Sequence, residues 1–211
     1  ELTAGGTTHK ADFAVLAVPP TLWDRIGIEP ALPIAKPQMG VNTKFLARLK
    51  APVWDDRNPE VLSTGIVSEI WHATDKQPAG GDIGMVGFAG GTAAAEGLKA
   101  YAASGDRSFV AEFERVFPEF RGKYVEHRYM DWPNQEWTKG GYTAAPPGYI
   151  VAHGEKLYAG TPRIKLAGEH CSFGFEGFME GALESGVRAA RALSAAIDSG
   201  QKPQARVRRG S

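Results

Sequence analysis

The segment over residues 166–193, LAGEHCSFGFEGFMEGALESGVRAARAL, constrains the fold more than any other part of the chain. It predicts a buried strand over 163–167, a glycine turn, and a long helix that begins near Glu176 or Gly177. The first turn of such a helix presents free N–H groups and a positive dipole end, which suit an electron-rich acceptor atom. An ordinary strand–turn–helix unit that packs tightly fits the same composition. Small residues that allow close approach recur along the expected helix at Gly181, Ala182, Ser185, Gly186, Ala189 and Ala190.

Composition excludes several classes of protein. The chain has 24 Lys plus Arg against 24 Asp plus Glu, so no net charge favours nucleic acid or an anionic membrane. No apolar run approaches the roughly twenty residues that a membrane span needs, which predicts a soluble protein. One cysteine, Cys171, excludes an internal disulfide, and the five histidines show no metal-ligand spacing. We therefore expect no metal site and no nucleic-acid partner.

The order of the remaining elements predicts an α+β fold. Strand pieces occur at both ends of the chain, and helices lie between the central strands. The expected strands cover residues 11–19, 43–49, 66–73, 84–89 and 124–131, with a turn at 80–82. The expected helices cover residues 92–103 and 107–117, with a helical turn at 23–26. Residues 140–149 are expected as a loop and the basic tail 201–211 as disordered.

The order of residues in the C-terminal segment is more informative about the protein family than its composition is. It reads AGE at 167–169, GFMEGA at 177–182 and ESG at 184–186. This pattern resembles the C-terminal flavin-contacting signature of the flavin amine oxidase family, which includes monoamine, polyamine and L-amino acid oxidases. The resemblance covers nearly the whole chain, and it implies FAD as the cofactor.

The resemblance also implies roles for individual residues in holding FAD. Glu169 would contact the ribityl or phosphate region. The helix N-terminus would meet the flavin pyrimidine ring through the backbone of Phe178 and Met179. The other cofactor-binding positions that the resemblance implies are Val18, Trp137, Gly168 and Gly177.

One element that the family requires does not occur in these 211 residues. No G-x-G-x-x-G fingerprint lies between a strand and a helix. We therefore expect an incomplete two-domain flavoprotein fold, whose dinucleotide-binding part comes from a second polypeptide or a cleaved N-terminal part. A processed multi-chain oxidase, assembled as an oligomer, is the simplest explanation, and an expression fragment is the other. Residues 1–35 and 155–200 would complete the FAD-binding domain, and 36–154 would form the substrate-binding domain.

Lys44 is the candidate catalytic residue. It follows VPP at 18–20 and LP at 32–33, and Trp54 comes after it, in the order that the family shows. The resemblance implies a lysine that is hydrogen-bonded through water to flavin N5 and that favours the reaction of reduced flavin with O2. A surface lysine on an edge strand is the alternative.

The segment WTKGGY at 137–142, with PPG at 146–148, is the second match. Monoamine oxidases carry a cysteine bonded covalently to the flavin immediately before a tyrosine. Gly141 stands there in this chain, so we expect FAD held noncovalently. Tyr142 and Phe178 match the two aromatic positions that flank the substrate amine, and Trp137 would line the same cavity. Core packing is the alternative for these aromatic residues.

Other candidate groups give weaker indications of a functional role. Cys171 and His170 fit packing or a structural role beside the cofactor better than catalysis. Glu180 and Glu184 lie at i and i+4 on one helix, whereas glycosidase chemistry needs carboxyl groups that face each other across a cleft. Arg188 is expected to be a solvated charge.

The leading functional hypothesis is FAD-dependent oxidative deamination of an amine, with an L-amino acid as the favoured substrate. A hydride passes to flavin N5, O2 is reduced to H2O2, and the imine hydrolyses to a keto acid and ammonia. We expect no protein base, because the amine is taken to arrive deprotonated. The alternatives are a monoamine or polyamine oxidase, an amino-acid 2-monooxygenase, and a flavoprotein subunit without turnover. The sequence indicates no cellular compartment.

Overall fold

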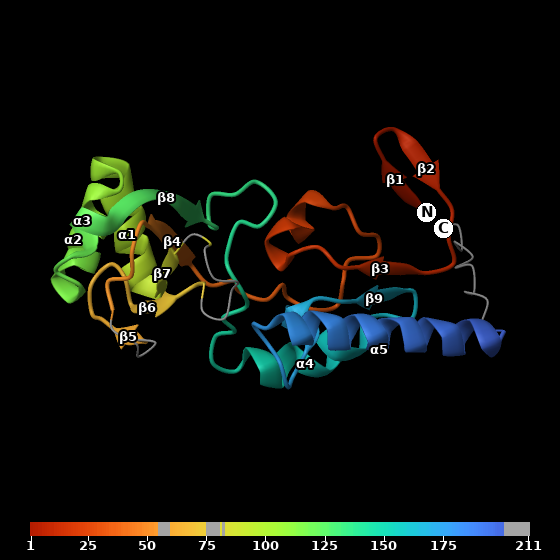
Figure 1. Cartoon of the computed structure of the whole chain (residues 1–211). Helices are drawn as coiled ribbons and strands as arrows, with labels where there is room; N and C mark the ends of the chain where they lie inside the picture. Colours follow the sequence, from red (N-terminus) through yellow and green to blue (C-terminus); the bar gives the residue numbers. More distant parts are fainter. Residues whose placement is uncertain (55–59, 75–80, 82, 201–211) are drawn as a thin grey trace. The chain divides into compact units, whose positions relative to one another are not determined.

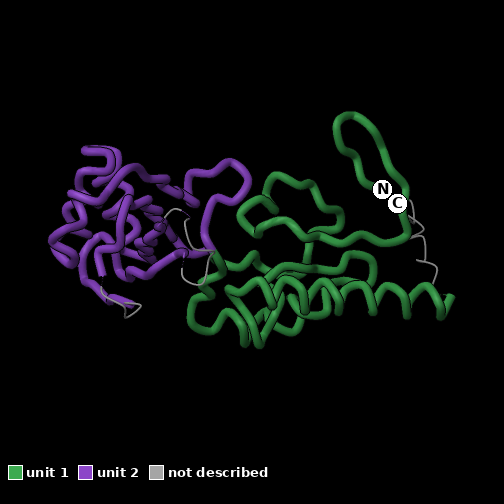
Figure 2. Tube along the Cα trace, viewed as in Figure 1, with its two compact units in different colours: residues 1–38, 142–211 green, residues 39–141 purple. Residues whose placement is uncertain are grey.

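The computed structural model of the chain describes residues 1–54, 60–74, 81 and 83–200. The chain divides into unit 1, residues 1–38 with 142–211, and unit 2, residues 39–141 (Figure 2). We predicted that the chain returns to its first domain near residue 155, whereas the structure places 142–154 in unit 1. The backbone N–H of Ala144 donates to the Gln38 carbonyl at 2.9 Å, which ties this segment to unit 1. The tail 201–211 lies outside the described residues.

Unit 2 is built on an antiparallel sheet with the strand order β5–β6–β7–β4–β8 (Figure 1). Its elements are β4 (Asn42–Leu49), β5 (Val61–Leu62), β6 (Glu69–His72), β7 (Ile83–Gly90), α1 (Gly91–Ser104), α2 (Arg107–Val116), α3 (Phe120–Lys123) and β8 (Tyr124–Asp131). The helices and strands predicted between residues 84 and 131 correspond to β7, α1, α2 and β8. Residues 80 and 82 of the predicted turn lie outside the described part of the chain.

The core of unit 2 follows from the alternation in β4. Phe45, Ala47 and Leu49 are all buried, as the period-two pattern predicts for one face of a strand. On that face the Phe45 ring stacks on Phe109 of α2, with centroids 4.9 Å apart. Lys44 therefore lies on the opposite face of the sheet.

Unit 1 combines a small parallel sheet with two helices (Figure 1). Strands β3 and β9 pair in parallel, and both α4 and α5 contact β9. A hairpin of β1 and β2, which the sequence reading did not predict, precedes β3. The elements of unit 1 are β1 (Leu2–Ala4), β2 (Thr7–His9), β3 (Ala14–Leu16), η1 (Pro20–Arg25), α4 (Tyr149–Ala159), β9 (Ile164–Leu166), η2 (Glu169–Cys171) and α5 (Met179–Asp198).

Three features of unit 1 differ from the prediction. Strand β3 is shorter than the expected 11–19, since β9 pairs with residues Ala14–Leu16 only in the described chain, and Val15 in it is exposed. Helix α4 was missed. Its Gly154 suppresses the helical signal but lets Phe173 pack close, since a Cβ there would lie 2.9 Å from the Phe173 ring. Helix α5 begins at Met179, because Gly177 has a φ of +85° and cannot continue a helix.

The described helices include none with both the length and the apolar character that crossing a bilayer requires.

Candidate functional site

Glu169 joins two segments of unit 1 that are far apart in the sequence. Its Oε1 accepts hydrogen bonds from the Thr143 backbone N–H at 3.0 Å and from the Thr143 hydroxyl at 2.8 Å. Its Oε2 accepts one from the Gly177 N–H at 2.7 Å. Hydrogen bonds to a carboxylate are stronger than neutral ones. Glu169 therefore fixes the loop 142–148 against the backbone that leads into α5.

Ser185 of α5 holds the backbone just before Glu169. The fully buried Ser185 hydroxyl accepts from the Gly168 N–H at 2.9 Å and lies 2.9 Å from the Gly168 carbonyl oxygen, to which it can donate. Gly168 has a φ of +136°, which favours glycine, and a Cβ there would lie 2.3 Å from the His170 ring. The predicted small face of the helix is confirmed at its buried positions, which are Gly181, Ser185 and Ala189.

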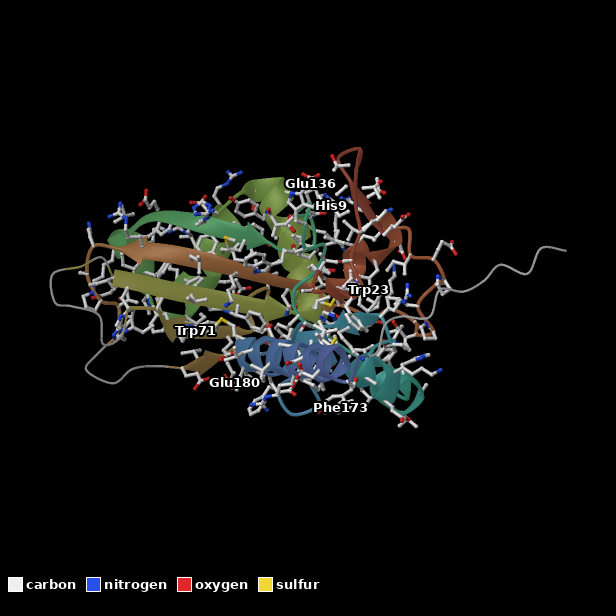
Figure 3. All side chains as sticks on the ribbon, turned by 90° about the vertical axis from the view of Figure 1, so that its right-hand side faces the viewer. His9, Trp23, Trp71, Glu136, Phe173 and Glu180 are labelled. Carbon is white, nitrogen blue, oxygen red and sulfur yellow. The ribbon has the colours of Figure 1, made fainter. Side chains whose placement is uncertain are left out.

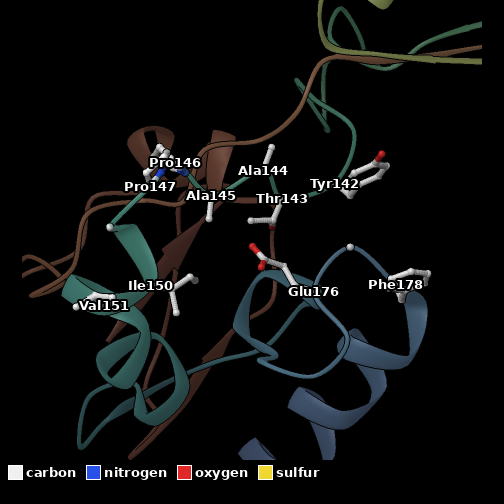
Figure 4. Close-up of a pocket in the computed structure, with 12 residues that line it drawn as sticks. Tyr142, Thr143, Ala144, Ala145, Pro146, Pro147, Ile150, Val151, Glu176 and Phe178 are labelled. Atoms are coloured by element: carbon white, nitrogen blue, oxygen red, sulfur yellow. The ribbon is translucent and has the colours of Figure 1, made fainter. Parts of the chain in front are cut away.

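A cavity of about 660 Å³ opens between the loop after Tyr142 and the start of α5 (Figure 4). This volume lies in the range typical of small-molecule sites. Tyr142 and Phe178 lie at the same end of the cavity in Figure 4, and both residues are exposed, Phe178 largely so. Gly177 lies beside the Tyr142 ring, since a Cβ built on it would be 3.5 Å from that ring. Apolar residues form most of the wall, which is lined by Tyr142, Thr143, Ala144, Ala145, Pro146, Pro147, Gly148, Ile150, Val151, Glu176, Gly177 and Phe178.

Glu176 places a carboxyl group in this mostly apolar wall. Its Oε1 is sealed from solvent and has no hydrogen-bond partner among the described residues. Burial, followed by the nearby charge of Glu169, raises the pKa of Glu176. The sequence reading missed this residue, although an isolated acid between glycine and aromatic residues is the signal that could have drawn attention to it.

His170 and Cys171, which follow Glu169, are buried. Burial lowers the pKa of His170, whose ring meets Trp23 edge-on with centroids 5.8 Å apart. Burial raises the pKa of the Cys171 thiol to about 12, so the nucleophilic thiolate is not formed at neutral pH. Arg188 is not the solvated charge that we expected. It donates to the Cys171 carbonyl at 2.8 Å and lies 3.8 Å from the centroid of the Tyr158 ring.

The remaining candidates are distributed over both units. In unit 1, Val18 accepts a hydrogen bond from the Trp23 indole N–H at 3.2 Å. In unit 2, the Lys44 ammonium lies 5.5 Å from the centroid of the Trp71 ring. Lys44 is also aligned across the sheet with Phe88 of β7, which pairs in turn with Glu69 of β6. The Trp137 side chain is largely exposed.

Gly141 leaves no room for a side chain. A Cβ at this position would lie 2.0 Å from Oδ1 of Asn42, which is buried in β4. The Gly141 N–H also donates to the Gly40 carbonyl at 2.8 Å. A larger residue here would therefore require Asn42 to move.

In the described part of the chain, no group of three or more His, Cys, Asp or Glu side chains is placed to hold a metal ion.

The hydrogen bonds of Glu169 to Thr143 and Gly177, here called the Glu169 clasp, should contribute to the stability of unit 1. Glu169→Ala removes three charge-assisted hydrogen bonds and should lower the free energy of unfolding by about 2 kcal/mol or more. Chemical denaturation of both proteins measures this loss. Glu180→Ala, in the exposed first turn of α5 (Figure 3), is the matched control and should leave stability nearly unchanged. Equal stabilities for the two variants would show that Glu169 does not join these segments.

Comparison with known proteins gives a consistent result. Residues 1–194 match the sequence model of the family described as flavin containing amine oxidoreductase. An L-amino acid dehydrogenase of Synechocystis is 27% identical over 201 residues, which cover 92% of this chain and 43% of that protein. The human flavin-containing amine oxidase B is 26% identical, over 88% of this chain and 38% of its own length.

Solved structures show the same relationship. Cyclohexylamine oxidase from Brevibacterium oxydans has a TM-score of 0.82 and 26% identity, over 93% of this chain and 45% of that chain. A putrescine oxidase bound to putrescine has a TM-score of 0.76 over 86% of this chain and 42% of that chain; at 23% identity it shows the fold alone. The chain thus spans less than half the length of each of these relatives.

Proposed function

The chain belongs to the flavin-containing amine oxidoreductase family, and we propose that it forms the C-terminal part of an enzyme that oxidises an amine. FAD is the cofactor of this family. The observation that carries the proposal is the family match over residues 1–194, which contains both the Glu169 clasp and the cavity beside it. We favour an L-amino acid as the substrate.

The residues of unit 1 fit a flavin. The cavity has a suitable volume for a small-molecule ligand. The first turn of α5 has no side-chain cap, so its N–H groups suit the electron-rich edge of a ring. We propose that Phe178 and Met179 contact the flavin through their backbones. Further contacts with FAD are proposed for Val18, Trp137, Gly168, Glu169 and Gly177.

When bound, FAD supplies a hydride acceptor at N5 and passes the electrons on to O2, which yields H2O2. The Tyr142 and Phe178 rings would flank the amine and orient its lone pair, and Trp137 would close the substrate cavity. Phe178 has no hydroxyl, so this wall acts through its ring face alone. Lys44 would hold a water molecule at the flavin. The imine product would hydrolyse to a keto acid and ammonia.

Two substrate classes are supported by the relatives. The name of the Synechocystis relative, an L-amino acid dehydrogenase, favours an amino acid for this chain. The names of the human amine oxidase and of the cyclohexylamine oxidase instead favour an amine without a carboxylate. A monoamine or polyamine oxidase would use such a substrate. An amino-acid 2-monooxygenase and a subunit without turnover are the remaining candidates, which product analysis separates.

We also propose that protein outside these 211 residues grips the FAD pyrophosphate. The sequence contains no G-x-G-x-x-G fingerprint for this task. Within the described residues the β3–β9 sheet has two strands, and Val15 in it is exposed, as expected for a surface that further protein covers. A second polypeptide in a processed oligomer would supply this part.

Assays of the complete FAD-loaded protein test the proposed function. We would measure H2O2 and ammonia release on a panel of L-amino acids, monoamines and diamines, and flavin bleaching without O2. Bleaching by an amino acid with peroxide release supports the favoured reaction. Bleaching without peroxide indicates that another electron acceptor is used, and an amide product indicates a monooxygenase. A flavin that none of these compounds reduces would contradict amine oxidation.

Noncovalent attachment of FAD is a further prediction. Gly141 has no thiol, and Asn42 fills the space where a side chain would begin. Precipitation of the yellow holoprotein in acid should therefore leave all flavin absorbance in the supernatant. Flavin fluorescence that stays with the protein band on a denaturing gel would contradict the prediction.

A further inference from the structure

Glu176 has no role in the reaction as described so far. Among the described residues that line the cavity, it is the only carboxyl group. It reaches the cavity from the segment just before α5, and Figure 4 shows its carboxyl directed toward the loop that carries Thr143 and Ala145. Tyr142 and Phe178, the rings proposed to flank the amine, line the same cavity.

The surroundings of Glu176 disfavour its anionic form. Burial and the charge of Glu169, which η2 brings close, raise the pKa of Glu176. From α4, Tyr149 remains neutral, since burial, Cys171 and Glu176 raise the pKa of its hydroxyl to about 12. Tyr142, on the loop, is the other ionisable residue among the described residues that line the cavity. None of these groups is a cation, and the described residues that line the cavity include no Lys, Arg or His to pair with the Glu176 carboxylate.

A cationic ligand would supply the missing partner. An ammonium group donates hydrogen bonds and brings the positive charge that these surroundings lack. The aromatic faces of Tyr142 and Phe178 attract a cation as well. The cavity therefore combines an apolar wall, two ring faces and one carboxyl group, which is the chemistry that recognises a primary ammonium with an apolar body.

We propose that Glu176 binds the ammonium of the substrate and takes its proton, so that the amine enters the oxidation step as the free base. One N–H bond of the ammonium breaks and an O–H bond forms on Glu176. The electron pair of the N–H bond stays on nitrogen, and no oxidant is consumed. Glu176 is then the base that the sequence reading did not expect. The assignment rests on the proposed function, because it requires an amine as the substrate.

The pH dependence of kcat/KM in the FAD-loaded protein is the first test. In the wild type, the carboxylate accepts the proton, so kcat/KM should be level between the pKa of Glu176 and that of the substrate ammonium. Glu176→Gln uses only the amine that is already neutral in solution. Its kcat/KM should be about 1,000-fold lower near pH 7, and should rise about tenfold per pH unit up to about pH 10. The same profile in both proteins would overturn the proposal.

Proton counting with tert-butylamine is the second test, and it does not depend on oxidation because this amine has no hydrogen on its α-carbon. Calorimetry at about pH 8 in buffers of different ionisation enthalpy gives the protons released on binding. The wild-type holoprotein should release about none, since Glu176 takes the proton, and Glu176→Gln should release about one. Equal release by both proteins, or no binding to the wild type, would contradict the role of Glu176.

Two variants separate a specific effect from misfolding. Glu180→Gln, which lies exposed one turn further along, should match the wild type in both tests. Glu176→Asp should recover part of the level profile, because it keeps a carboxyl group. Failure of every amine to reduce the flavin would refute the proposed function, whereas the proton count with tert-butylamine would still decide whether Glu176 keeps the proton of the bound ammonium in the complex.

Discussion

Lys44→Met should slow the reoxidation of the reduced flavin by O2 by about 100-fold, while the affinity for FAD changes little. The expected size is that of losing one positioned donor in an active site. Lys44 is suited to hold a water molecule, because it is half-buried on the face of β4 opposite the phenylalanine core and lies 5.5 Å from the Trp71 ring centroid. Methionine keeps much of the apolar stem but cannot donate hydrogen bonds.

Rapid mixing of the reduced holoprotein with O2 measures this rate, and an FAD titration of the apoprotein measures the affinity. Lys50→Met is the matched control, since Lys50 is exposed just beyond the end of β4. It should reoxidise at the wild-type rate. Unchanged oxygen kinetics in Lys44→Met would remove Lys44 from the site, and equal losses of rate and FAD affinity would indicate a role in binding instead.

Gly181→Ala should destabilise unit 1 by about 3 kcal/mol, whereas Gly186→Ala should stabilise it by about 0.5–1 kcal/mol. The two glycines lie in the same helix, α5. A Cβ at Gly181 would lie 2.2 Å from the Phe175 carbonyl oxygen, so backbone atoms would have to shift. A Cβ at Gly186 meets nothing within 4 Å, so only the better helix propensity of alanine remains.

Denaturant unfolding of the two variants and the wild type measures both changes. Gly181 also lies at the N-terminus of α5, so Gly181→Ala should weaken FAD binding, and Gly186→Ala should not. Two stabilised variants would show that α5 does not approach the Phe175 backbone closely. FAD binding that is unchanged in a destabilised Gly181→Ala protein would place the cofactor away from this end of the helix.

The sequence predicts those parts of the fold that depend on local periodicity. Alternation in β4 places Phe45, Ala47 and Leu49 on one face, which the structure shows to be buried, and the small residues of α5 mark the face that carries Ser185. Helix α4 escaped prediction because its Gly154 lowers helix propensity, while the packing of Phe173 that compensates for it comes from a distant segment.

The site was predictable in its motifs but not in its contacts. Motif matching indicated Glu169 and Gly177, but the hydrogen bonds to Thr143 link residues 26 positions apart and emerge only in the folded chain. Glu176 gave no motif, because its importance follows from a cavity wall that several separate segments build. Arg188 was misjudged for the same reason, since its partners Cys171 and Tyr158 lie in other elements.

A crystal structure of the complete protein with FAD bound tests the central claim most directly. The account predicts an isoalloxazine ring against the N-terminal end of α5, in contact with the backbone of Phe178 and Met179, with the Tyr142 and Phe178 rings in front of it. It further predicts that residues outside this sequence grip the pyrophosphate. A flavin bound elsewhere, or an α5 N-terminus that faces only solvent or apolar side chains, would contradict the account.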